Sequence, residues 1–425
     1  MERFFGIFGI IFIFLVAFLM SNNKKSINIK TIGMGFLLQI LLAVFVLKTP
    51  IGQAIFGNIG LFIQKILDFA NQGATFLFGP LNNSHRLNEI FGAGSMVFAI
   101  QLLAAIIFIA VLVNLLYYYR IMQKIVAVLG KAMYKLMDVS GAEALSNVAS
   151  SFVGQVMAQF MIKPYLPNLT RSEVLASMTG SMACISGGVM ALYVGMGIPA
   201  QYLLAASIMA APGALVISKI VYPEDGQPQT KDEVKISKRR THVNVVDSIA
   251  RGATDGLNVA LKVIAVLLAF VALIAMIDWF LGKTGVFLHN AIHMNLAFLG
   301  LDIDHLSMKA IVGKFFSVFA YLMGVPFKDS SAVGSLMGTK FILNETLGYM
   351  DLVSIKNIIS DKSFIIASFA LCGFANLSSI AIQIGGIGEM APNQRKNLSR
   401  LGLRALICGT LASYMSACIA GILLG

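Results

Sequence analysis

Charged residues are scarce in this chain. Only 12% of its 425 residues are Asp, Glu, Lys or Arg, whereas 57% are hydrophobic. A soluble globular domain carries about twice this charged fraction. The composition therefore excludes a soluble domain and predicts an all-α polytopic membrane protein.

Cysteine is also rare, and its positions do not suggest chemistry. The sequence lacks HExxH, GxSxG and paired intramembrane aspartates, the motifs expected of catalysis within a membrane. We therefore predict a protein that is not an enzyme and that has no cofactor. The cysteines are interpreted as small packing residues and not as disulfides or metal ligands, because all four lie in apolar segments without metal-site spacing: Cys184, Cys372, Cys408 and Cys418.

Acidic residues are fewer than basic ones, which gives a formal net charge of +12. The basic residues gather in short loops between apolar segments. This pattern is typical of positive-inside topology and of contact with anionic membrane lipid, so no nucleic-acid partner is expected. Four groups carry the pattern: Lys24, Lys25 and Lys30; Arg120, Lys124, Lys131 and Lys135; Lys231, Lys235, Lys238, Arg239 and Arg240; Arg395, Lys396, Arg400 and Arg404.

Eight apolar segments are long enough to predict membrane-spanning helices: 4–20, 31–47, 95–118, 172–198, 200–221, 257–281, 361–387 and 401–424. Placing all four basic groups in the cytoplasm agrees with eight crossings and leaves both termini outside. No small-residue cleavage site follows the first segment, which predicts a retained helix of a multi-pass protein in the cell membrane. The amphipathic segments 51–70 and 119–137 are expected to lie along the membrane surface.

Two further apolar regions have polar centres. Residues 140–166 contain Ser, Gly and Gln before Pro164, and residues 308–350 are interrupted between Gly324 and Ser331. Counting either as one crossing would invert the basic loops that follow, so each predicts a re-entrant hairpin. The chain then divides into four parts: scaffold helices with an interfacial helix in 1–118, a first transport half in 119–221, a cytoplasmic linker with a scaffold helix in 222–307, and a second transport half in 308–425.

The stretch Leu371–Gly388 is apolar enough to cross a bilayer, but polar residues and glycines interrupt it. Such a pattern indicates a broken helix beside a binding site. Ser181–Gly197 resembles a degenerate copy, in which Ala183–Ser186 aligns with Ala375–Ser378. Each copy follows a hairpin and precedes a closing helix, and the basic loops give the two copies opposite orientations. This order predicts the inverted repeat of secondary transporters, whose site lies where the repeats meet.

Polar and aromatic residues near the hairpins and breaks are candidate ligand groups. The cost of a carboxylate in an apolar segment favours a functional role for Glu345 over an ion pair with Lys340. Isolated Asn and Ser residues can also join helices, but their clustering favours a site. Without a fixed cation among them, the candidates suit an uncharged polyhydroxylated ligand with a planar ring: Gln155, Glu345, Phe374, Asn376, Ser379 and Gln383.

Three stretches resemble the concentrative nucleoside transporters: GFANLSSIAIQIGGIG, VPFKDSSAVGSLMGTKFILNETLGY and the frame FVGQ…KPYLPNLTRSE. The resemblance runs from about residue 95 to the C-terminus. It implies a homotrimer whose transport part moves like an elevator and takes up nucleosides with a sodium or proton gradient. It also implies that Gln155 and Val189 face the base with Phe374 nearby. Glu345, Asn376 and Ser379 would then hold the ribose hydroxyls.

The sequence departs from this family at two places. The usual tip of the first hairpin is Gly-Gln-Thr/Ser-Glu, whereas here Val156 and Met157 follow Gln155. The sodium site implied by the resemblance also differs, because one of its positions holds a cysteine. A thiol is a poor ligand for a hard cation such as sodium. The positions of this site correspond to Ser150, where the family has Asn, and Cys184, where the family has Ser, together with the carbonyls of Val153 and Ile185.

Several functions are compatible with these departures. The first is proton- or sodium-coupled uptake of a nucleoside, including a modified or atypical one. The alternatives are transport of a different small polar ring compound, and a non-transporting channel or receptor on the same scaffold.

Overall fold

A computed structural model describes residues 5–92, 97–231, 243–292 and 302–424 of the chain. Every regular element in these ranges is an α-helix or a short 3-10 helix, as expected for an all-α polytopic protein. The middle of the predicted linker, 232–242, and the end of the same predicted part, 293–301, lie outside the described residues. The first residues of the predicted spans 4–20 and 95–118 lie outside them as well.

The helices before the linker comprise five N-terminal helices and a first group of six. These are α1 Phe5–Leu19, α2 Ile29–Lys48, α3 Pro50–Phe78, α4 Ser84–Phe91 and α5 Phe98–Tyr118, followed by α6 Ile121–Met137, α7 Gly141–Val153, α8 Met157–Met161, α9 Arg171–Ala183, α10 Gly187–Gly195 and α11 Ala200–Val221. Short 3-10 helices join some of them: η2 Lys24–Ser26, η3 Gly79–Asn82 and η4 Leu166–Asn168.

After the linker, one long helix precedes a second group of six. These are α12 Val245–Ile292, then α13 Met308–Leu322, α14 Phe327–Ile342, α15 Glu345–Ser354, α16 Asp361–Leu371, α17 Leu377–Met390 and α18 Arg395–Leu424, with the 3-10 helix η6 Pro392–Gln394 before α18. The order of helices in α13–α18 repeats that in α6–α11. All eight predicted spans are helical, and the two predicted breaks separate α9 from α10 and α16 from α17.

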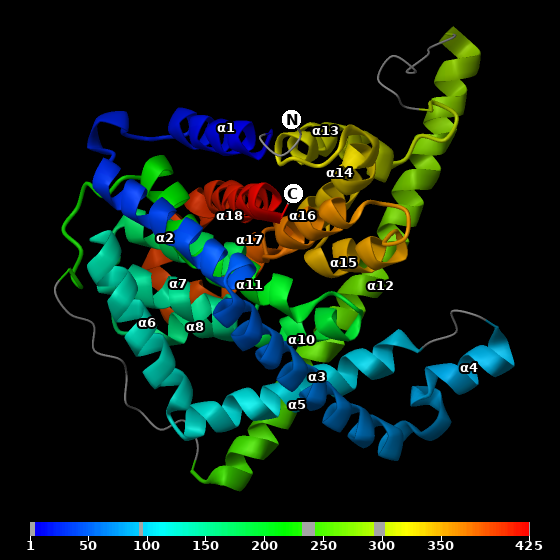
Figure 1. Ribbon diagram of the computed structural model, residues 1–425, viewed down its shortest axis with the longest axis horizontal. Coiled ribbons are helices and arrows are strands. Elements are labelled where there is room, and N and C mark those ends of the chain that lie inside the picture. Colours follow the sequence, from blue (N-terminus) through cyan, green and yellow to red (C-terminus); the bar gives the residue numbers. More distant parts are fainter. Residues whose placement is uncertain (1–4, 93–96, 232–242, 293–301, 425) are drawn as a thin grey trace.

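Two pairs of helices pack closely, α5 with α12 and α11 with α18. Helices α5 and α12 lie along one another at one side of the molecule, whereas α11 and α18 lie at its centre and are almost entirely buried (Figure 1). Helices α1 and α2 pack against α11 and α18. The start of α1 lies against the end of α18, where Gly6 contacts Ile422, so both ends of the described chain lie on the same side.

The predicted surface helices are present but differ in length. The segment 51–70 becomes the longer α3, which crosses the end of α10 at Gly195 and the start of α11 at Ala200. The segment 119–137 becomes α6, which buries one face while its lysines remain exposed. An amphipathic helix with this pattern suits the boundary between protein and solvent.

The predicted second hairpin differs from the structure. Residues 308–350 form parts of three helices with two turns, at Met323–Pro326 and at Leu343–Asn344. The first turn contains the Gly and Pro residues that interrupt the hydrophobic pattern, so sequence analysis placed the hairpin tip there. The tip that corresponds to the first hairpin is the second turn, because it directly precedes the predicted ligand residue Glu345.

The register of the two broken helices also differs from the sequence alignment. Ser186 caps α10 by accepting from the backbone N–H of Val189, and Asn376 caps α17 by accepting from that of Ser379. The shared cap role places Ser186 opposite Asn376, whereas the sequence alignment placed it opposite Ser378. The glycines near the end of Leu371–Gly388 are helical, and the break lies before Asn376.

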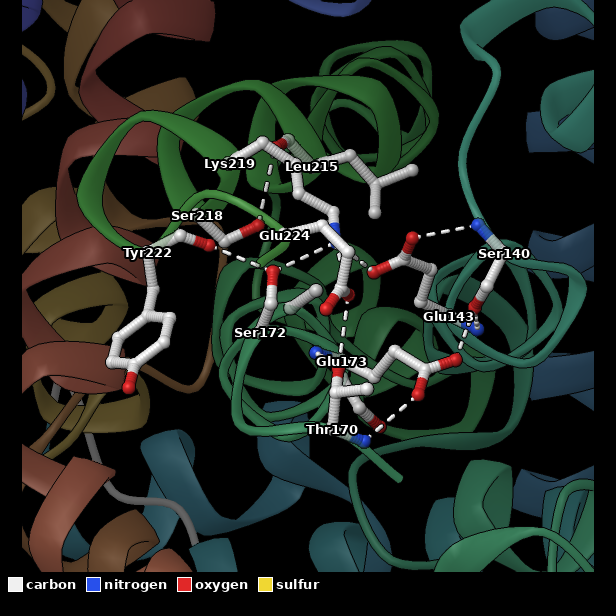
Figure 2. A network of polar contacts seen from close by, with 12 residues as sticks. Ser140, Glu143, Thr170, Ser172, Glu173, Leu215, Ser218, Lys219, Tyr222 and Glu224 are labelled. Carbon is white, nitrogen blue, oxygen red and sulfur yellow. Dashed lines mark hydrogen bonds and ion pairs between the residues drawn. The ribbon is translucent and has the colours of Figure 1, made fainter. Parts of the chain in front are cut away.

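A buried ion pair fastens the base of the first hairpin (Figure 2). Lys219, near the end of α11, lies 2.7 Å from the Glu143 carboxylate of α7 and donates to the Ser172 hydroxyl of α9 at 2.8 Å. Ser140, the cap of α7, donates to Glu173 of α9 at 2.6 Å. Four of these five residues are at most 3% exposed, and Lys219 is 7% exposed. The base of the first hairpin is therefore joined to both α9 and α11.

The base of the second hairpin is held in a comparable way, but here the carboxylate lies on the hairpin and the capping hydroxyl on the broken helix. Asp329, in the first turn of α14, accepts from the Ser360 hydroxyl at 2.8 Å and from the Ser363 hydroxyl at 2.6 Å. Ser360 is the cap of α16, as Thr170 is the cap of α9. In both halves a carboxylate and hydroxyls thus join the base of the hairpin to the start of the broken helix.

The Lys219→Met variant tests the first fastening. Removing one partner of a buried ion pair leaves the other charge uncompensated, which costs about 3–5 kcal/mol. We expect a clear fall in the melting temperature of the purified protein, and a smaller fall for the double variant Glu143→Leu/Lys219→Met. The exposed Lys25→Met is the control. Equal melting of Lys219→Met and wild type would show that the pair does not hold the hairpin.

Candidate functional site

Glu345 lies at the start of α15 and is 5% exposed. The Tyr193 hydroxyl of α10 donates to its Oε1 at 2.9 Å, and Asn376 Nδ2, at the start of α17, donates to its Oε2 at 3.0 Å. Hydrogen bonds to an ionised acceptor are stronger than those between neutral groups. The carboxylate is therefore held in one orientation by residues of both broken helices.

In the structure, Glu345 and Lys340 do not form an ion pair with each other. Lys340 Nζ donates instead to the carbonyl oxygen of Ala370 at 2.8 Å, in the last turn of α16. The last carbonyls of a helix lack partners within the helix, and a cation is favourable there. Lys340 thus stabilises the helix break, and this arrangement supports a separate role for Glu345.

The cap of α17 orients the Asn376 amide. Its Oδ1 accepts from the Ser379 backbone N–H at 2.9 Å and from the Ser378 hydroxyl at 2.7 Å. Only Nδ2 then remains to donate, and it faces Glu345. Ser379 and Phe374 are 1% and 9% exposed, so both lie inside the protein at this break.

The tip of the first hairpin contacts the first helix break. Gly154 has a φ of 89°, a left-handed conformation that favours glycine. A Cβ at this position would lie 3.0 Å from Ser186 Cβ. Because Ser186 caps α10, the tip lies beside the first turn of the helix that carries the half-buried Val189.

The residues after Gly154 reach the second broken helix. Gln155 is half-buried, and its Oε1 lies 3.5 Å from Gln383 Nε2 of α17. Val156 packs against Gly386 of the same helix. Met157 is the first residue of α8 and is 49% exposed. It takes no part in the contacts described above for the other candidate residues. The structure therefore brings Gln155 and Val156 to α17, and Glu345 to α10 and α17.

The residues that resemble a sodium site already have protein partners. The Ser150 hydroxyl donates to the Ser146 carbonyl at 2.7 Å and lies 3.1 Å from the Ser181 hydroxyl. The Cys184 thiol lies 3.1 Å from the Ser151 hydroxyl. A hard cation prefers several free oxygen ligands. The Ser150 hydroxyl still has acceptor lone pairs, and Val153 and Ile185 offer backbone carbonyl oxygens, whereas the thiol of Cys184 is a poor ligand for a hard cation.

A cavity of about 680 Å³ lies beside the end of α10. Its amide and hydroxyl side chains come from α3, from η3 and the residue after it, and from α5, and its apolar lining comes mainly from α3, α10 and α15; among the described residues, no Asp, Glu, Lys or Arg lines it. Such a lining suits passage of an uncharged polar molecule better than passage of an ion. The polar residues are Asn71, Thr75, Asn82, Asn83 and Gln101.

Sequence analysis missed Tyr193 and left Gln383 without a specific role. Both are fully buried, and each contacts a hairpin residue of the other half of the protein. A buried tyrosine in an apolar helix resembles ordinary core packing, so its residue type carried no signal. The spacing of each residue from its helix cap could have revealed them.

Three family profiles match the chain. The profile described as the C-terminus of Na⁺-dependent nucleoside transporters covers residues 202–421, and the profile described as their N-terminus covers residues 8–81. A profile described as nucleoside recognition covers residues 99–200. The match thus includes both helix breaks and almost the whole chain.

Curated relatives match along the full chain. Nucleoside permease NupC of Helicobacter pylori is 40% identical over 426 residues, which are 99% of this chain and 98% of the permease. Sodium/nucleoside cotransporter 1 of Rattus norvegicus is 34% identical over 441 residues, which are 99% of this chain and 64% of the cotransporter.

Solved structures share the fold. CNTnw in an inward-facing substrate-bound state matches with a TM-score of 0.90 at 39% identity, covering 99% of this chain and 98% of that one. A substituted CNTnw in an outward-facing state matches with a TM-score of 0.92 at 39% identity and the same coverage.

The Gly373→Ala variant tests the geometry of the second break. Gly373 has a φ of 130°, and a Cβ there would lie 2.7 Å from the Ala183 carbonyl oxygen. We expect a destabilisation of more than about 1 kcal/mol, measured as a lower melting temperature. In the control Gly385→Ala the new Cβ meets open space on α17, and it should be neutral or stabilising. Equal effects of the two variants would contradict the close approach of the breaks.

Proposed function

Because this chain belongs to the concentrative nucleoside transporter family, we propose that it takes up nucleosides across the cell membrane, driven by a cation gradient. The observation that carries the proposal is the Glu345 carboxylate, buried and held by Asn376 between the two broken helices. A buried acceptor at a junction of inverted repeats is suited to bind the hydroxyl groups of a neutral solute.

The two ends of the nucleoside would meet different residues. We assign the ribose hydroxyls to Glu345, Asn376 and Ser379, since these lie together at the start of α15 and α17. The base would lie beside Gln155 and Val189, on the side of the first hairpin and α10. Phe374 would contact the planar ring.

The apolar tip of the first hairpin limits the substrate. The side chains of Val156 and Met157 offer no hydrogen bonds at the positions where, by the resemblance, the family has a hydroxyl and a ribose-binding carboxylate. A ligand hydroxyl or amide that lost its partner there would cost about 1–3 kcal/mol. This supports a modified or atypical nucleoside as a substrate.

We propose the proton as the coupling ion and Glu345 as its carrier. Cys184 places a thiol, which lies against the Ser151 hydroxyl, where a hard cation would need an oxygen ligand, and this supports a proton over sodium. The description of the family profile as Na⁺-dependent favours sodium instead. Uptake driven by each gradient alone separates the two.

An elevator movement in a homotrimer agrees with the packing. Helices α5 and α12 form a pair that could act as the fixed scaffold, and the two groups that contain the hairpins would move along it. Many large apolar side chains of α12 are exposed, which suits contact with lipid or with other copies of the chain. The proposed parts remain 1–118, 119–221, 222–307 and 308–425, with both termini outside and the basic loops in the cytoplasm.

Uptake by purified protein in proteoliposomes tests the function. We expect accumulation of a radiolabelled nucleoside under an inward proton gradient in sodium-free buffer, and a loss of at least tenfold in Glu345→Gln, equal to about 1.4 kcal/mol. Lys25→Met, far from the site in sequence, is the control. Equilibration of the nucleoside across the membrane without accumulation would support a channel. Binding of the nucleoside without uptake would support a receptor. A strict need for sodium would overturn proton coupling.

The double variant Ser150→Asn/Cys184→Ser tests whether these two residues weaken coupling to sodium. These changes introduce the residue types of the family's sodium site, and they replace a thiol by an oxygen ligand. We expect uptake to gain stimulation by sodium at constant pH. The single variant Cys184→Ser serves as the comparison. Identical sodium dependence in wild type and the double variant would refute this explanation.

A further inference from the structure

The two repeats share the spacing between their helix caps. Thr170 caps α9 and Ser186 caps α10, while Ser360 caps α16 and Asn376 caps α17. The separation along the chain is the same in both pairs. Residues at equal distances from these caps therefore occupy equivalent positions in the two repeats.

This register makes Tyr193 and Gln383 equivalent. Each lies about two helical turns beyond its cap, on α10 and α17. The same separation along the chain relates Gln155, at the tip of the first hairpin, to Glu345, after the tip of the second. Two pairs of equivalent residues thus lie at the centre of the protein.

The contacts cross between the repeats. Tyr193, in the first repeat, donates to Glu345 in the second at 2.9 Å, and its hydroxyl lies 3.0 Å from the Thr346 hydroxyl. Gln383, in the second repeat, donates to Gln155 in the first at 3.5 Å and to the Met178 carbonyl at 3.3 Å. Tyr193 and Gln383 are both 0% exposed.

We propose that Tyr193 and Gln383 are equivalent positioning residues, each of which orients the hairpin residue of the opposite repeat and thereby sets selectivity for one end of the substrate. Tyr193 acts on the sugar through Glu345, and Gln383 acts on the base through Gln155. The inference rests on the proposed nucleoside transport and names residues that do not themselves need to touch the substrate.

The two residues restrict their partners in different ways. Tyr193 and Asn376 engage opposite oxygens of Glu345, so loss of the tyrosine hydroxyl frees the carboxylate to rotate. Gln383 Nε2 engages the oxygen of Gln155, which leaves the Gln155 NH₂ group to face a carbonyl of the base. Without this contact the Gln155 amide can present either end.

A buried acceptor supports a role for Gln383 beyond packing. Its Oε1 has no hydrogen-bond partner among the residues that the structure describes. Such a group is unfavourable in the interior unless water or a ligand reaches it. Its position on α17, one turn beyond Ser379, places it beside the residues assigned to the ligand.

The test compares Tyr193→Phe and Gln383→Met for their selectivity. The Tyr193→Phe variant should raise KM for uridine about tenfold but leave KM for 2′,3′-dideoxyuridine within twofold, because the dideoxy sugar lacks the hydroxyls that Glu345 binds. The Gln383→Met variant should instead bring the uridine-to-cytidine KM ratio toward one and leave the ratio between uridine and dideoxyuridine unchanged. The maximal rate should change little in both.

The matched control is Tyr349→Phe. The Tyr349 ring lies 4.4 Å from that of Tyr193 and is equally buried, but its hydroxyl donates to the Ser368 carbonyl. A loss of packing would affect both tyrosine variants alike, whereas positioning of Glu345 affects only Tyr193→Phe. Melting temperatures of all variants are measured beside KM.

Two results would overturn the proposal. One is a change of both selectivities by both variants, and the other is an equal effect of Tyr193→Phe and Tyr349→Phe on uridine KM. Wild-type uptake of a panel of natural and modified nucleosides, uridine included, is measured in the same experiment. Uptake of none of them would reject nucleoside transport itself, a failure that is distinct from unchanged selectivity in active variants.

Discussion

Two interrupted helices inside an apolar protein impose the main constraint on this structure. Each break exposes backbone groups that a membrane interior cannot hydrate, so protein must satisfy them. Ser186 and Asn376 accept from the N–H groups that begin α10 and α17, and Lys340 donates to the carbonyl of Ala370 at the end of α16. The breaks also satisfy one another, because the Phe374 N–H donates to the Cys184 carbonyl.

The polar groups at the breaks form the proposed site. An asparagine that caps α17 through its oxygen has an NH₂ group left over, and this group meets Glu345. Each hairpin tip lies against the cap of its own repeat: Gly154 allows the first tip to lie against Ser186, and Glu345, after the second tip, accepts from Asn376. In the proposed site, backbone satisfaction and ligand binding would depend on the same few residues, which accounts for the gathering of polar side chains in a chain with so little charge.

Buried charges hold the bases of the hairpins. The Glu143–Lys219 pair joins the first hairpin to α11, Lys219 also donates to Ser172 at the start of α9, and Asp329 joins the second hairpin to the start of α16. The tip of the first hairpin contacts the broken helices without such charge pairs, through Gly154 and Ser186 and through Gln155 and Gln383.

Much of the fold could be read from hydrophobic pattern. The eight predicted spans, the first hairpin and both breaks follow from segment length and from polar residues within apolar runs, which depend on local sequence. The second hairpin was misplaced because Gly324 and Pro326 mark a turn equally well whether it is a connection or a tip. The register of the repeats was wrong because residue identity in apolar helices carries little information, whereas cap geometry is specific.

The sequence by itself determined the all-α membrane class, the repeated order of hairpin, broken helix and closing helix, and the candidates Glu345, Asn376 and Gln155. Only the tertiary structure decided which groups face one another. It separated Lys340 from Glu345, gave Ser150 and Cys184 protein partners, and brought Tyr193 and Gln383 to the opposite hairpins. The physical reason is that these contacts join residues far apart in the chain, and no local pattern of hydrophobicity encodes the direction in which a buried polar side chain points.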